Sequence, residues 1–159
     1  MQQQPVRVLV ADGDIASRKN LTWHLEDAGY RIVPASSGSD VLLQVEVEPP
    51  DVIILDTCLP DIDGYDVCSQ LRRDPSTRDI PVILIAAPTD GMTRAYLAKM
   101  VDYAGGDYFV AKPCDVNVLV HLVTLVAPTA ERPNPVMLPG FPTRMVWPTT
   151  RVRPLLAAL

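Results

Sequence analysis

The sequence alternates short runs of apolar, often β-branched residues with longer segments whose apolar residues recur at helical spacing. This alternation predicts strand–helix units around a parallel sheet, because two parallel strands need a long crossover, usually a helix, between them. The five expected strands are Val6–Val10, Arg31–Ala35, Val52–Leu55, Val82–Ile85 and Tyr108–Ala111. The five expected helices are Ile15–Ala28, Ser39–Val47, Gly64–Arg73, Met92–Ala104 and Asp115–Val126, with Gly29 and Gly105 as left-handed caps after the first and the fourth.

The middle strands of this pattern consist almost entirely of valine, isoleucine and leucine. Strands of this composition are typical of a sheet that helices cover on both faces. We therefore expect an α/β fold, a doubly wound parallel sheet that forms one domain over residues 1–126.

Charged residues follow three of the expected strands at the point where each strand ends. Asp12 and Asp14 come after the first strand, Asp56 after the third, and Lys112, followed by Pro113, after the fifth. In an open parallel sheet, ligands bind beyond the carboxyl ends of the strands. The sequence therefore predicts that three carboxylates and one ammonium group meet at this edge of the sheet.

Composition and charge argue against several classes of protein. The formal charge of −5 argues against a general electrostatic grip on nucleic acid, which needs clustered lysine and arginine. The three cysteines lack the spacing of a disulfide framework or a zinc site. The N-terminus does not resemble a signal peptide, and no apolar run is long enough to cross a bilayer. We expect a cytoplasmic protein without membrane contact.

Four segments, VRVLVADGD, PPDVIILDTCLPDIDGYDVCSQLR, IPVILIAA and GGDYFVAKP, resemble the landmark segments of response-regulator receiver domains such as the chemotaxis receivers. The most specific one places Asp56 after an apolar strand, then Pro60, then the Asp63–Gly64 turn before a helix. The resemblance covers Val6 to Val126 and implies a flavodoxin-like strand order of 2-1-3-4-5.

The resemblance also implies a function. The chain is expected to be a single-domain response regulator, not an enzyme, that accepts a phosphoryl group on Asp56 from a sensor histidine kinase or a phosphotransfer protein. The signal is then expected to pass to a downstream protein through the face formed by the fourth helix and the fifth strand. A second copy of the chain, in a homodimer, is a further expected partner.

The site that the resemblance implies has a clear electrostatic purpose. A carboxylate repels the phosphate that it must attack, so positive charge has to neutralise both. In the family, Mg²⁺ is held by carboxylates such as Asp12 and Asp56 and by the backbone carbonyl of Cys58, while Lys112 contacts the phosphoryl group. The bond between Lys112 and Pro113 is expected to be cis, which aims the lysine.

Two positions depart from the family pattern. Gly13 stands where a second acid commonly touches the metal, so Mg²⁺ affinity is expected to be weakened unless Asp14, one residue beyond, takes that role; the alternative for Asp14 is to cap the following helix. Ala86 stands where a switch hydroxyl is usual, and Phe109 takes the place of the switch aromatic. Coupling between phosphorylation and surface change is expected to be weakened.

The tail over residues 127–159 differs in composition from what precedes it. It holds seven of the sixteen prolines, and its four arginines against one glutamate give it a charge of +3, which leaves −8 on residues 1–126. It is too short for a DNA-binding output module, and it is not expected to form a separate domain. Its apolar and aromatic residues suit docking on the receiver, on a second copy or on a partner; a disordered remnant is the alternative.

Two other functions remain open from the sequence. An atypical receiver could act as a binding or dimerisation module without phosphorylation, which the departures at Gly13 and Ala86 favour. The segment VLVADGD also resembles the nucleophile loop of haloacid-dehalogenase-like phosphatases, with Asp12 as nucleophile and Asp14 as acid/base. The phosphatase reading leaves the Asp56 segment unexplained.

Overall fold

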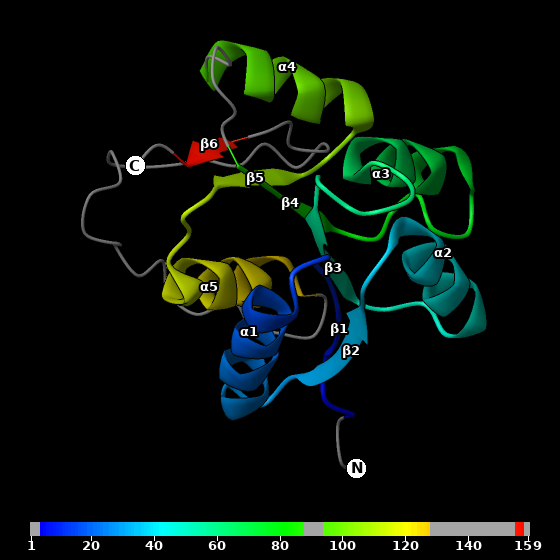
Figure 1. The fold of residues 1–159 in the computed structure, drawn as a ribbon. Coiled ribbons are helices and arrows are strands. Elements are labelled where there is room, and N and C mark those ends of the chain that lie inside the picture. The colour runs from blue at the N-terminus through cyan, green and yellow to red at the C-terminus, as the bar shows by residue number, and fades with distance from the viewer. Residues whose placement is uncertain (1–3, 88–93, 128–154, 158–159) are drawn as a thin grey trace.

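The computed structural model of the chain describes residues 4–87, 94–127 and 155–157. Strands and helices alternate along it (Figure 1). The strands are β1 (Arg7–Ala11), β2 (Arg31–Ala35), β3 (Val52–Asp56), β4 (Val82–Ala86), β5 (Tyr108–Ala111) and β6 (Leu155–Ala157). The helices are α1 (Ile15–Asp27), α2 (Gly38–Val47), α3 (Gly64–Arg73), α4 (Arg94–Ala104) and α5 (Val116–Val126).

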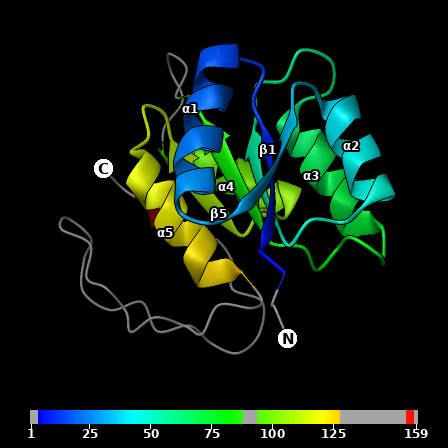
Figure 2. The same ribbon diagram turned by 90° about the horizontal axis from the view of Figure 1, so that it is seen from below.

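The strands form one parallel sheet in the order β2-β1-β3-β4-β5-β6. Helices α1 and α5 cover one face of the sheet, and α2, α3 and α4 cover the other (Figure 2). The predicted doubly wound α/β fold and its order 2-1-3-4-5 are confirmed. The sequence did not predict β6, which extends the sheet beyond β5.

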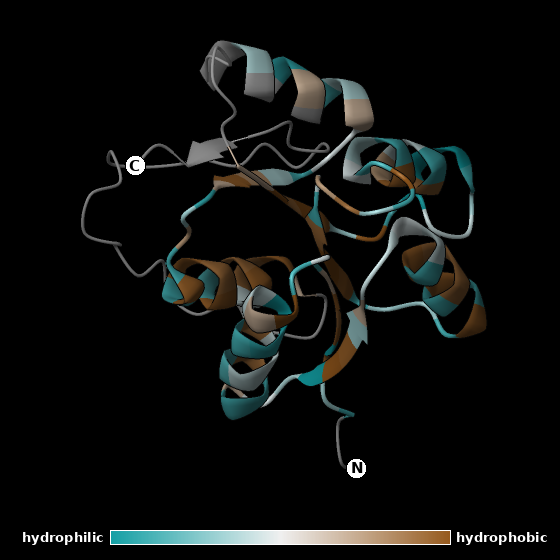
Figure 3. Ribbon diagram, viewed as in Figure 1, coloured by the Kyte–Doolittle hydropathy of each residue, from teal (hydrophilic) through white to brown (hydrophobic). Residues whose placement is uncertain are grey.

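The core lies on both faces of the central strands. Every residue of β1, β3 and β4 is buried, as their continuous apolar composition predicted. Alternate side chains of these strands enter two separate apolar clusters, one under α1 and α5 and one under α2 and α3. Figure 3 shows a mixture of hydrophilic and hydrophobic residues on α1, α2 and α3, while α5 is mostly hydrophobic.

Local signals explain where the helices begin and end. Aspartate or serine caps accept backbone N–H bonds at the start of α1, α2, α3 and α5. Gly29 and Gly105 have φ angles of 93° and 79° after α1 and α4, as predicted for left-handed caps. Asp115 caps α5 and does not begin it, and the expected start of α4 at Met92 lies outside the described residues.

No helix within the described part of the chain is long and apolar enough to cross a membrane.

Candidate functional site

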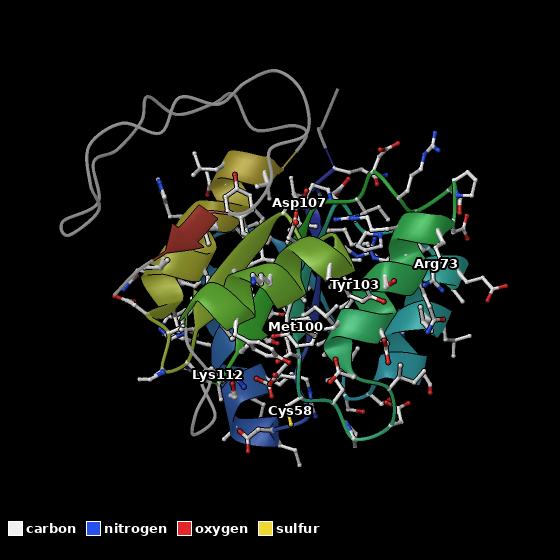
Figure 4. All side chains as sticks on the ribbon, turned by 90° about the horizontal axis from the view of Figure 1, so that it is seen from above. Cys58, Arg73, Met100, Tyr103, Asp107 and Lys112 are labelled. Atoms are coloured by element: carbon white, nitrogen blue, oxygen red, sulfur yellow. The ribbon has the colours of Figure 1, made fainter. Side chains whose placement is uncertain are left out.

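Three of the four charged side chains that were predicted to meet at the carboxyl edge of the sheet do so, and Asp14 does not. The Lys112 ammonium lies 2.5 Å from Oδ2 of Asp56 and 3.5 Å from Oδ2 of Asp12. Both aspartates are buried, with exposed fractions of 3% and 1%. Figure 4 shows Lys112 and Cys58 at this edge and Asp107 at the opposite one. The result is a pair of buried carboxylates bridged by one cation.

Asp12 is fixed by the first turn of α1. Its Oδ1 accepts a bond from the backbone of Asp14 at 2.8 Å, and its Oδ2 accepts one from the Ser17 hydroxyl at 2.6 Å. Arg18 donates to the Asp12 carbonyl at 2.5 Å. Ser17 and Arg18 were not predicted as site residues; their only signal in the sequence is their place in the first turn after the acidic loop.

Asp14 caps α1 in the structure, which is one of the two roles that the sequence left open. Its carboxylate is exposed and accepts the backbone N–H of Ser17 at 2.7 Å, which caps α1. Gly13 turns toward the site: a Cβ built on it would lie 3.6 Å from the carbonyl oxygen of Cys58. Position 13, and not position 14, is therefore where a third carboxylate would join the site.

The oxygen atoms at this edge fit a magnesium site with few protein ligands. Oδ1 of Asp56 accepts the backbone N–H of Cys58 at 2.9 Å, which holds the Cys58 peptide beside the carboxylate. Mg²⁺ prefers one or two carboxylates plus waters over a closed protein cage. Among the described residues no three His, Cys, Asp or Glu side chains form a metal-binding group. Asp12, Asp56 and the Cys58 carbonyl, the ligands that the resemblance implies, are the groups that would hold the ion.

Burial and mutual charge set the protonation of the cluster. Burial raises the pKa of Asp56, the bonds from Lys112 and Cys58 offset this only partly, and the nearby Asp12 raises it further. Burial alone would lower the pKa of Lys112, but its contacts with Asp56 and Asp12 outweigh burial and raise it. Lys112 therefore stays a cation. The buried negative charge of Asp56 lowers the free energy of unfolding.

This cost predicts a pH-dependent gain in stability for Asp56→Asn. Because the folded-state pKa of Asp56 is raised, wild type loses stability as pH rises through that pKa, and it loses none below the ordinary aspartate value of 3.8. Asp56→Asn should therefore have the higher free energy of unfolding at neutral pH. The difference should vanish in acid, as denaturant unfolding at several pH values would measure.

Asp61→Asn is the matched control, and it should change the free energy of unfolding in the opposite direction. The Ser39 hydroxyl and the backbone N–H groups of Ser39, Ile62 and Gly38 bond the Asp61 carboxylate and lower its pKa. A lowered pKa contributes stability above 3.8 that is lost as pH falls. Asp61→Asn should thus be the less stable protein at neutral pH. An Asp56→Asn protein that is also less stable than wild type at neutral pH would show that the buried charge of Asp56 does not destabilise the fold.

The loop after β3 is tied down by contacts that the sequence did not reveal. Asp61 reaches the N-terminus of α2, where Gly38 donates to it at 2.6 Å and Ser39 at 2.9 Å. Thr57, directly after Asp56, is buried, and its backbone N–H donates to the Ile85 carbonyl at 2.9 Å. These contacts hold the Cys58 carbonyl in place between two anchored segments.

Gly64 lets α3 begin directly against the end of β3. A Cβ on Gly64 would lie 2.2 Å from the carbonyl oxygen of Asp56 and 2.7 Å from Cα of Thr57. The Gly64 N–H also donates to the Thr57 carbonyl at 2.9 Å. The Asp63–Gly64 turn of the sequence is thus a close backbone contact beside Asp56.

Gly64→Ala is expected to destabilise the protein by roughly 1–3 kcal/mol, because the added methyl group must push backbone away from Asp56. Gly13→Ala is the control: its Cβ would meet only Pro60 and Cys58 at 3.5 and 3.6 Å, which is ordinary contact. Thermal unfolding of both variants would measure this. A Gly64→Ala protein as stable as Gly13→Ala would show that the close contact does not constrain the site.

The two residues at the expected switch positions, Ala86 and Phe109, lie in the core. Ala86 ends β4 with 1% of its surface exposed, and Phe109 in β5 has 2%; both belong to the cluster under α2 and α3. The Ala86 carbonyl accepts the backbone N–H of Lys112 at 2.8 Å. The bond from Lys112 to Pro113 is cis, the geometry that the resemblance implied. Thr89, the next hydroxyl after Ala86 that the sequence offers, lies outside the described residues.

Comparisons with known proteins agree with this geometry. The family model of the response regulator receiver domain matches residues 8–124. The transcriptional regulatory protein AfsQ1 of Streptomyces coelicolor is 35% identical over 80% of this chain and 53% of its own length. The alkaline phosphatase synthesis transcriptional regulatory protein PhoP of Bacillus subtilis is 30% identical over 80% and 54%. The chain spans about half the length of these curated relatives.

Solved structures show the same fold. The crystal structure of a putative response regulator from Chloroflexus aurantiacus matches with a TM-score of 0.70 and 32% identity, over 77% of this chain and 98% of the other. The chemotaxis response regulator CheY4 of Vibrio cholerae matches with a TM-score of 0.69 and 23% identity, over 77% and 99%. At that identity the second likeness concerns the fold alone.

Proposed function

The chain belongs to the response regulator receiver domain family, and on this premise we propose that it accepts a phosphoryl group on Asp56 and signals through protein contacts. One observation carries the proposal. The Lys112 ammonium lies 2.5 Å from the Asp56 carboxylate and also contacts Asp12. A phosphoryl group on Asp56 would therefore have a positive charge beside it.

The proposed step is a nucleophilic displacement at phosphorus. A carboxylate oxygen of Asp56 forms a bond to phosphorus as the bond from phosphorus to a histidine nitrogen of the donor breaks. The bonding pair returns to the imidazole, which takes up a proton. Lys112 loses part of its contact with the Asp56 oxygen and contacts the phosphoryl oxygens instead. A bound Mg²⁺ would supply further positive charge at the same oxygens.

The donor in this proposal is a sensor histidine kinase or a phosphotransfer protein. The output is a protein contact at the face of α4 and β5, where the side chains of Tyr96 and Tyr103 on α4 are exposed. A homodimer is one form of that contact. The relatives AfsQ1 and PhoP are transcriptional regulators by name. In this proposal, the receiver that they share with this chain is the part that is phosphorylated.

A second candidate is a receiver that binds partners without being phosphorylated. Two observations favour it: position 13 offers no carboxylate beside the Cys58 carbonyl, and Ala86 at the end of β4 has no hydroxyl. The receiver family and the cap that Asp14 forms on α1 weigh against the phosphatase alternative. We propose a signalling protein and not an enzyme.

Binding of a phosphoryl analogue separates the two candidates. The full chain would be titrated with Mg²⁺ and beryllofluoride, and amide NMR shifts would be followed. Phosphorylation predicts saturable shifts around Asp56 and Lys112 that need both ligands and that Asp56→Asn abolishes. A wild-type spectrum that does not respond at saturating analogue would favour the binding module.

A further inference from the structure

The outer edge of β5 is covered by a segment from far along the chain. Leu155–Ala157 forms β6 and pairs in parallel with β5, with Leu155 opposite Tyr108, Leu156 opposite Phe109 and Ala157 opposite Val110. Figures 1 and 4 show β6 along β5, between α4 and α5. Without it, β5 would be the open edge of the sheet.

An open edge strand presents unpaired backbone groups that another strand readily joins. β5 is a good template because its neighbours α4 and α5 flank it and its inner side is already paired with β4. The joining segment is apolar, as a strand at this position would be, and it follows Arg151 and Arg153 in sequence. The tail carries +3 against −8 on residues 1–126, so charge also favours the contact.

The chain itself supplies this segment at high local concentration. Twenty-seven residues, 128–154, connect the end of the receiver to Leu155. Such a length spans on the order of 90 Å when fully extended, which is more than a small domain requires. A tethered segment of this reach has an effective concentration near the millimolar range, so even a weak strand pairing can be filled within one molecule.

We propose that the β5 edge is a strand-addition site whose occupant is the chain's own Leu155–Ala157, held within the same molecule, so that a partner reading this edge must first displace it. Because β5 carries the switch residue Phe109 and leads into Lys112, the covered edge adjoins the proposed output face. That link to signalling rests on the proposed function. The occupancy of the edge does not.

The test removes backbone donors from β6 in the full chain. Alternate residues of a strand point their N–H groups to the same side, so the double variant Leu156→Pro with Ala157→Pro loses one donor toward β5 whichever way β6 faces. Hydrogen exchange of the edge-facing amides in Tyr108–Val110 would be measured without Mg²⁺ or phosphodonor. We expect exchange at least about tenfold faster in the double variant, with the amides facing β4 unchanged.

Leu156→Ala is the matched control, since it shortens one side chain and keeps every N–H group. It should retain most of the protection. Equal exchange in wild type and the double-proline variant would overturn the proposal. A loss of protection in Leu156→Ala as large as in the double-proline variant would also overturn it, because the contact would then depend on side-chain packing. Protection in wild type that grows with protein concentration would assign the edge to a second copy and would also overturn it. A failure of phosphorylation at Asp56 would leave these measurements unchanged.

Discussion

Replacing Lys112 with methionine is expected to slow phosphorylation of the chain by a small phosphodonor at least about a hundredfold, the usual effect of removing one preorganised charge from a transition state. Methionine keeps an unbranched side chain of similar length, so packing changes little. The loss follows from geometry, because Lys112 contacts both Asp56 and Asp12. Initial rates of phosphoryl incorporation at saturating Mg²⁺ would measure it.

Two variants separate this effect from general damage. Arg18→Met removes a nearby cation that donates to the backbone carbonyl of Asp12, and it should change the rate little. Lys112→Arg keeps the charge in a bulkier, planar group and should recover part of the rate. A Lys112→Met protein that is folded and phosphorylated at the wild-type rate would remove Lys112 from the proposed chemistry.

Gly13→Asp is expected to tighten Mg²⁺ binding roughly tenfold, the effect of about 1.4 kcal/mol of added binding energy. The new Cβ would lie 3.6 Å from the Cys58 carbonyl oxygen without a close contact, so its carboxylate could join Asp12 and Asp56 around the ion that they would hold. Without metal, a third acid beside Asp56 should lower stability at neutral pH, and Mg²⁺ should restore it. Calorimetric titration of both proteins with Mg²⁺ would measure the change.

Gly13→Asn provides the isosteric control without charge and should gain much less. Asp14→Ala tests the neighbouring acid: since Asp14 caps α1, its loss should reduce stability and leave Mg²⁺ affinity nearly unchanged. Unchanged affinity in Gly13→Asp, together with weaker binding in Asp14→Ala, would mean that Asp14 leaves its cap to hold the metal.

The core of the fold could be predicted because its signal is local. Continuous apolar strands, helical spacing and glycine caps each act over a few residues, and together they locate β1 to β5 and the helices to within a residue or two. β6 has no such signal. Three apolar residues can become a strand only because the β5 edge is available to pair with them, and that edge exists only in the folded sheet.

Some features of the candidate site could likewise be predicted from the sequence, and others could not. Asp12, Asp56 and Lys112 could be predicted to converge because parallel strands end at one edge. The choice between capping and metal binding for Asp14 depended on where its carboxylate points, which spacing does not fix. The anchoring of the Asp56 loop by Asp61 depends on a contact with Ser39, 22 residues away in sequence, and could only be seen in three dimensions.

The proposed function requires Asp56 to be the phosphoacceptor, and the position of the phosphoryl group tests this most directly. The full chain would be incubated with Mg²⁺ and acetyl phosphate, the acyl phosphate trapped by reduction, and the modified residue located by mass spectrometry. We expect modification at Asp56 alone and none in Asp56→Asn. Modification at Asp12, or an unmodified Asp56 with excess donor, would contradict it.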